Sequence, residues 1–176
     1  MAVNNAQGQG DSSFWNDDRP HGELNRLKWY TAGEVPPGPA WKIVADLGNE
    51  PEVCFKKVMD VIEKILTTSR ESWPDADNWK VMLPGWFLEA TQEFTQAEYS
   101  ELLSKTSEDD WDTLPWDFES WLNAIHVRDW QWWSYIRNEG NLEIQLTLTG
   151  WPAHLEAFEH ILEAAGANIS SSREVR

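Results

Sequence analysis

Residues 130–166 read WQWWSYIRNEGNLEIQLTLTGWPAHLEAFEHILEAAG and carry the clearest structural pattern in the chain. Apolar and polar residues alternate along 130–137 and along 141–149, which predicts two antiparallel strands. The tripeptide at 138–140 predicts a three-residue turn with Gly140 in the left-handed conformation. The turn would pair Ile136 with Leu142, Ser134 with Ile144, Trp132 with Leu146, and Trp130 with Leu148. We expect the face that carries the apolar residues of these pairs to be buried.

A helix follows the two strands. Pro152 in its first turn and Gly166 just past its end predict that it covers 153–165. Its apolar residues recur at helical spacing and form one stripe, made of Leu155, Phe158, Ile161, Leu162 and Ala165. We expect this stripe to pack on the apolar face of the strands and to form the centre of the core.

The remaining elements are predicted from shorter patterns. They are strands over 41–47, 79–83 and 86–90, and helices over 51–68, 96–105 and 115–126. Asn49 is expected to cap the helix over 51–68. Thr95 and Glu98 form a capping box ahead of the helix over 96–105, in which Tyr99 and the two leucines after it are expected to face inward.

Together these elements predict a single α+β domain, with a mainly antiparallel sheet of about four to five strands and helices packed on one face. The helices over 51–68 and 153–165 are expected to share that face. The predicted parts of the chain are a disordered N-terminal tail (1–13), an irregular Trp- and Pro-containing arm (14–40), the α+β domain (41–170) and a flexible C-terminus (171–176).

The charge of the chain restricts its partners. The 176 residues include 30 Asp and Glu but only 14 Lys and Arg, which gives a net charge of −16. This balance argues against direct binding to nucleic acid or to anionic lipid and favours cationic or neutral partners. The single Cys54 excludes an internal disulfide, and the first thirty residues do not resemble a secretion signal, so a cytoplasmic location is expected.

Residues 107–121 form the most biased segment. They contain six acidic residues, three tryptophans and no Lys or Arg. Two of the acids are expected in the first turn of a helix, where they complement its positive end. The segment is predicted to bind a basic protein through Asp109, Asp110, Trp111, Asp112, Trp116, Asp117 and Glu119, because carboxylates attract the partner and aromatic rings stack on its Arg or Lys side chains. The alternative is a solvated acidic loop.

Two further aromatic residues need an explanation. The predicted register places Trp133 and Tyr135 on the face of the hairpin opposite the core. Either the arm around Phe14, Trp15 and Trp29 covers them, which is the favoured interpretation, or they form an exposed recognition patch. They are therefore also candidate partner-binding residues.

The function expected from these features is partner binding. No phosphate-binding loop, zinc motif or nucleophile motif occurs in the sequence, so no enzyme activity, metal or cofactor is predicted. Small acidic chains of this kind have the character of bacterial immunity proteins and antitoxins, which bind and block another protein. We expect a module that inhibits or scaffolds a basic protein. The alternatives are an acidic mimic of nucleic acid, of the kind that phages encode, and a small-ligand binder or enzyme with a Trp-lined pocket.

Overall fold

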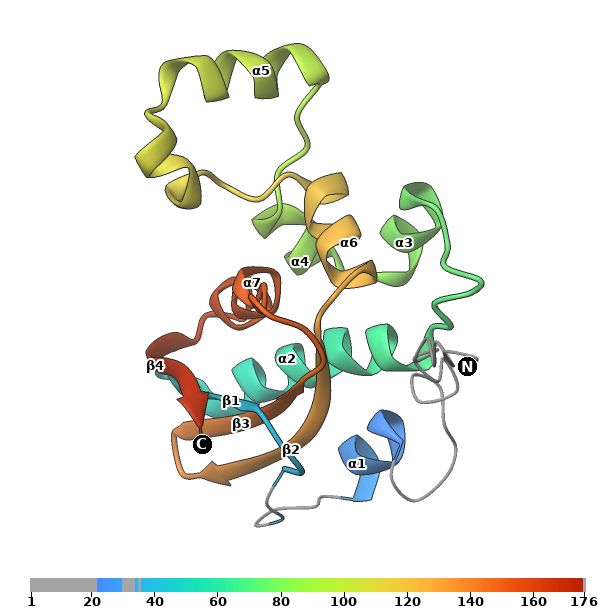
Figure 1. Cartoon of the computed structure of the whole chain (residues 1–176), viewed down its shortest axis with the longest axis vertical. Helices are drawn as coiled ribbons and strands as arrows, with labels where there is room; N and C mark the ends of the chain where they lie inside the picture. The colour runs from blue at the N-terminus through green and yellow to red at the C-terminus, as the bar shows by residue number, and fades with distance from the viewer. Residues whose placement is uncertain (1–21, 30–33, 35, 176) are drawn as a thin grey trace, which may run out of the picture.

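The protein folds around a four-stranded sheet, as shown by a computed structural model that describes residues 22–29, 34 and 36–175 (Figure 1). The strands are β1 (Ala40–Asp46), β2 (Trp130–Asn138), β3 (Asn141–Leu148) and β4 (Asn168–Val175). They lie in the order β2-β3-β1-β4, and all three neighbouring pairs are antiparallel. This confirms the predicted α+β class.

The described residues also form seven α-helices and one 3-10 helix, not all of which lie next to the sheet (Figure 1). They are α1 (Glu23–Trp29), α2 (Pro51–Thr67), α3 (Ala76–Met82), α4 (Gly85–Ala90), α5 (Gln96–Lys105), the 3-10 helix η2 (Glu108–Thr113), α6 (Phe118–His126) and α7 (Glu156–Ala165). Helices α2 and α7 lie over the same face of the sheet, as predicted, and α1 lies beside β2 (Figure 1). The predicted stripe of α7 is buried, and Gly166 ends that helix in the left-handed conformation (φ 98°). Helix α7 begins later than predicted, however, so Pro152 precedes it.

The register of the hairpin differs from the prediction at its turn. The turn has two residues, with Asn138 opposite Asn141, and Glu139 rather than Gly140 takes the positive φ (50°). A β-bulge at Trp133 compensates for this difference, so Trp132 still lies opposite Leu146. The predicted partners of Trp130 and Trp132 are therefore correct. Those of Ser134 and Ile136, which lie between the bulge and the turn, are wrong. A bulge adds one residue to one strand, which a strict two-residue period does not anticipate.

The bulge also changes the face on which the outer residues of β2 lie. Tyr135 is opposite Ile144 and shares its core-facing side, whereas Ile136 is opposite Glu143 on the other side. The ring of Tyr135 lies 5.6 Å from that of Phe55 on α2. The prediction that Tyr135 points away from the core is therefore wrong.

The two strands predicted between 79 and 90 are helices α3 and α4. Asp75 caps α3 by accepting a hydrogen bond from Asn78 N (2.9 Å). Trp79 and Leu83 are buried, whereas Val81 between them is 86% exposed. On a strand all three would share one face, so this burial is that of a helix. Short apolar runs fit both templates, and here tertiary packing decides between them.

Both ends of the chain are more ordered than predicted where the structure describes them. Strand β4 replaces the predicted flexible C-terminus, and Trp41 Nε1 donates a hydrogen bond to Ser172 Oγ (2.7 Å) across β1 and β4. Strand β4 lies at an edge of the sheet, where polar residues are common. Its sequence is mostly polar and therefore lacks the alternation of apolar and polar residues that marks β2 and β3. The predicted tail (1–13), Phe14 and Trp15 lie outside the described residues.

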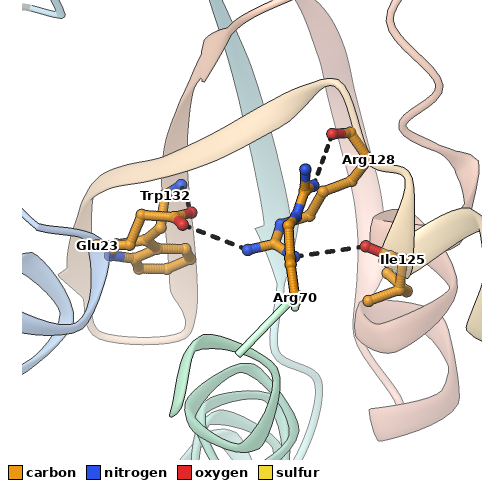
Figure 2. A network of polar contacts seen from close by, with 5 residues as sticks. All are labelled: Glu23, Arg70, Ile125, Arg128 and Trp132. Atoms are coloured by element: carbon orange, nitrogen blue, oxygen red, sulfur yellow. Dashed lines mark hydrogen bonds and ion pairs between the residues drawn. The ribbon is translucent and has the colours of Figure 1, made fainter. Parts of the chain in front are cut away.

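Helix α1 occupies part of the arm predicted to be irregular, and a buried polar network attaches it to the sheet (Figure 2). Glu23 accepts a hydrogen bond from Trp132 N (2.6 Å) and pairs with Arg128 (3.2 Å). Arg70 donates to the Arg128 carbonyl (2.8 Å). Since β2 is an edge strand, some of its N–H groups point away from the sheet, and Glu23 satisfies one of them.

Candidate partner-binding site

Residues 92–117 form a separate projection from the body, which we call the acidic lobe. Its two ends meet where Gln92 N donates to the Trp116 carbonyl (3.1 Å) and Phe118 N donates to the Gln92 carbonyl (2.8 Å). Between these ends the chain forms α5 and η2, and Figure 1 shows α5 standing apart from the sheet. The lobe is therefore closed at its base and accessible along its length.

Helix α5 is held at its start by a capping box and by an aromatic contact. The predicted capping box of Thr95 and Glu98 is present, and the ring of Phe94 lies 6.0 Å from that of Tyr99. No residue of α5 is buried, so Tyr99, Leu102 and Leu103 do not reach the central core, although they form the least exposed side of this helix, as predicted. These three side chains are half-buried. Because α5 contributes nothing to the central core, it leaves an apolar stripe near the surface.

The acidic lobe concentrates the negative charge of the chain. It contains eight acidic residues and one lysine, a net charge of −7 out of −16 for the whole sequence. Glu108, Asp109 and Asp110 are exposed in the first turn of η2. Asp112 belongs to the same 3-10 helix, but its side chain lies outside the described part of the chain. A basic surface approaching the lobe therefore meets an attractive field.

A cavity of about 350 Å³ lies between the acidic lobe and the start of α7. Its described lining consists of Tyr99, Trp111, Leu114, Pro115, Trp116, Asp117, His154 and Glu156. Trp111 is 46% exposed, and its Nε1 donates to the Thr106 carbonyl (3.3 Å). Trp116 is half-buried. The cavity thus offers aromatic surface that neither the sheet nor α2 covers.

The fold brings together only some of the predicted site residues. Trp111, Trp116 and Asp117 line the cavity, and Asp109 and Asp110 are exposed beside it on η2. Asp117 is the N-cap of α6, where its carboxylate accepts from Ser120 N (3.0 Å), and α6 begins at 118 instead of 115. Glu119 is exposed in the first turn of α6 and does not line the cavity.

Three lining residues outside the acidic segment were missed by the sequence analysis, and Leu114 and Pro115 inside that segment were not predicted either. Tyr99 was predicted to face inward. His154 lies just before α7 and Glu156 is its first residue, more than thirty residues after the acidic segment. His154 Nδ1 lies 3.5 Å from an Asp129 carboxylate oxygen. No local pattern links these residues to the acidic segment, because only the tertiary fold brings them next to it.

Trp133 and Tyr135 lie away from the cavity. The guanidinium carbon of Arg26 is 3.4 Å from the centre of the Trp133 ring, and Trp133 Nε1 donates to the Glu34 carbonyl (3.1 Å). Arg26 and Glu34 of the predicted arm therefore contact Trp133, which is half-buried, whereas cover by Phe14 and Trp15 lies outside the described residues. The side chain of Trp29 lies outside the described part.

His160 supports the wall of the cavity from behind. Its ring lies 6.4 Å from that of Trp116, and its Nε2 is 2.9 Å from Thr91 Oγ1. Burial lowers the pKa of His160 from 6.5 to about 4, because charging the imidazole here would remove it from water. The neutral ring is therefore the form that packs against Trp116 at neutral pH.

Acidification is expected to destabilise the fold through His160. The unfolded chain binds a proton near pH 6.5 but the folded chain only near pH 4, so the unfolded state holds more protons in this window and the free energy of unfolding falls as the pH falls. Urea unfolding at about pH 7.5 and pH 5 should show a larger loss of stability for the natural protein than for His160→Gln. Equal losses in the two proteins would contradict this assignment.

Within residues 22–29, 34 and 36–175, no group of three or more His, Cys, Asp or Glu is arranged to hold a metal ion. In the same part of the chain, no helix is long and apolar enough to cross a membrane. Cys54 is buried on α2, and burial raises the pKa of its thiol, which disfavours the reactive thiolate.

No protein-family model, no curated protein and no solved structure matches this chain.

Proposed function

We propose that the protein binds a basic protein through its acidic lobe, and thereby inhibits or scaffolds that protein. The observation that carries the proposal is the joining of two features in one projection: a net charge of −7 and a cavity lined by Trp111, Trp116 and Tyr99. Complementary charge accelerates the encounter and selects the partner. Tryptophan and tyrosine are the residue types that most often carry binding energy at an interface.

Two structural properties of the acidic lobe also support this role. Helix α5 has an apolar stripe but no buried residue, so a partner can cover that stripe without disturbing the core. Fixed ends at Gln92 and Trp116 reduce the conformational freedom that binding would otherwise remove. This mode of action corresponds to that of an immunity protein or antitoxin, which blocks its target by covering a surface of it.

A second candidate is a small-ligand binder that uses the same cavity. Its volume of about 350 Å³ falls at the lower end of the range found for ligand pockets. A small ligand would bind with little dependence on the exposed acids of η2, whereas a basic protein would depend on them strongly.

Neutralising the exposed acids of η2 is expected to slow association with the partner. The variant Glu108→Gln/Asp109→Asn/Asp110→Asn should reduce the association rate about ten-fold at low salt and much less at high salt, since long-range attraction is screened. Its stability should change little, because exposed charges contribute little to folding.

The partner is to be captured from the cells that naturally produce the protein, with three baits in parallel. These are the natural protein, the η2 variant, and a control with the same charge change outside the lobe, Glu63→Gln/Glu71→Gln/Glu163→Gln. The proposal expects a basic protein that the natural and control baits retain and the η2 variant loses, followed by rate measurements with that protein. Equal retention by all three baits, or displacement by added DNA, would overturn it.

A further inference from the structure

Three arginine side chains of this protein lie in similar surroundings within the fold. Each contacts both an aromatic ring and a carboxylate: Arg26 with Trp133 and Glu34, Arg128 with Trp130 and Glu23, and Arg137 with Phe55 and Glu52. The distances from the guanidinium carbon to the ring centre are 3.4, 5.0 and 4.6 Å. The ring accepts the cation on its face while the carboxylate takes the N–H groups.

The cavity of the acidic lobe presents the same two kinds of group. Trp111, Trp116 and Tyr99 supply rings, and Asp117 and Glu156 supply carboxylates. None of the described lining residues is a Lys or Arg. The cavity therefore provides the aromatic and acidic components of this arrangement without its cation.

The two carboxylates of the cavity differ in their existing contacts. Asp117 already accepts hydrogen bonds from Ser120 N (3.0 Å) and from Phe94 N (3.3 Å). Glu156 is exposed in the first turn of α7, and its carboxylate makes no hydrogen bond or ion pair with the described residues. An incoming cation can thus pair with Glu156 without breaking an existing contact.

From these observations we infer that the cavity binds the side chain of an arginine from the partner protein. The guanidinium stacks on Trp111 or Trp116 and donates hydrogen bonds to Glu156. Arginine fits better than lysine because its planar group is weakly hydrated, stacks on aromatic rings and can donate two parallel hydrogen bonds to a carboxylate. The inference rests on the proposed function and specifies the residue that anchors the partner.

The test uses small probes and the indole N–H signals in ¹H–¹⁵N NMR spectra of the whole chain. Trp111→Phe, Trp116→Phe and Trp151→Phe variants assign three of the signals. Trp151 is 70% exposed and does not line the cavity, so it serves as an internal control. N-acetyl-arginine amide, its lysine counterpart and the uncharged citrulline counterpart are titrated to about 50 mM at constant ionic strength, which suffices to detect millimolar affinity.

The arginine probe is expected to shift the signals of Trp111 and Trp116, but not that of Trp151, at lower concentration than the lysine probe. The citrulline probe should have little effect. Glu156→Gln should lower the affinity for the arginine probe about two- to five-fold, the effect expected for the loss of an exposed ion pair. Glu163→Gln removes the same charge from an exposed position of α7 outside the cavity and should leave the affinity unchanged.

The inference is overturned if the lysine or the citrulline probe binds as tightly as the arginine probe, or if no probe shifts any indole signal. It is also overturned if the Trp151 signal shifts as much as that of Trp111, or if Glu156→Gln and Glu163→Gln have the same affinity for the arginine probe. Each of these results leaves the proposed function standing, because capture of a basic partner by the lobe is measured separately.

Discussion

Replacing Glu23 with alanine is expected to lower the free energy of unfolding by about 3 to 5 kcal/mol, the range for removing one partner of a buried ion pair. Glu23 and Arg128 are both buried, with their charged atoms 3.2 Å apart. The substitution removes this carboxylate from the Arg128 guanidinium and from the backbone N–H of Trp132, so both lose a partner within the fold (Figure 2). Urea unfolding at neutral pH measures the change.

Removing both charges is expected to cost much less than removing one. Burial raises the pKa of the Glu23 carboxyl even though Arg128 and the Trp132 N–H oppose the shift, which indicates that desolvation of this group is expensive. The variant Glu23→Leu/Arg128→Met should therefore recover a large part of the stability lost in Glu23→Ala. Glu101→Gln, which breaks the exposed pair with Lys105, serves as a control with a small effect. A loss in Glu23→Ala no larger than in this control would contradict the structural role of the network.

Leu146→Ala is expected to destabilise the fold by about 2 to 5 kcal/mol, as for other large core residues cut to alanine. Leu146 is fully buried between Trp41 of β1 and Trp132 of β2, which lie opposite it on the two flanking strands. Truncation leaves a void that this rigid aromatic surface cannot fill.

The control for Leu146→Ala is Val81→Ala on α3, since Val81 is 86% exposed. Denaturant midpoints of the two variants should differ clearly. If the midpoint of Leu146→Ala stayed at that of the natural protein, Leu146 would lie on the surface and the register of β2 and β3 would be wrong.

Elements were predictable where two independent local signals agreed. Helix α7 combines an apolar stripe with Gly166 at its end, and α5 combines a capping box with the contact of Phe94 and Tyr99. Strand β1 was predicted almost to the residue from alternation alone. The cap of α2 was predicted wrongly: Asn49 was expected to cap this helix, but the N-cap is Glu50, without a side-chain hydrogen bond.

The remaining features depend on contacts between distant parts of the chain. Trp79 is helical because α3 packs it into the core, and β4 is a strand because β1 supplies its hydrogen bonds. The sequence did single out Trp111 and Trp116, since neither fits the core stripe of α6. It could not indicate that Glu156 would complete their cavity, because that proximity arises from the packing of the acidic lobe against the start of α7.

The central claim, that the acidic lobe is the surface that binds a basic protein, is tested most directly by site-specific photo-cross-linking in the cells that naturally produce the protein. A photoreactive amino acid replaces Ser107, which is exposed at the start of η2, or Val81, which is exposed on α3 outside the lobe. The account predicts a covalent adduct with a basic protein from position 107, suppressed at high salt, and none from position 81. An adduct formed from position 81 but not from 107, or an acidic protein as the main adduct at 107, would contradict it.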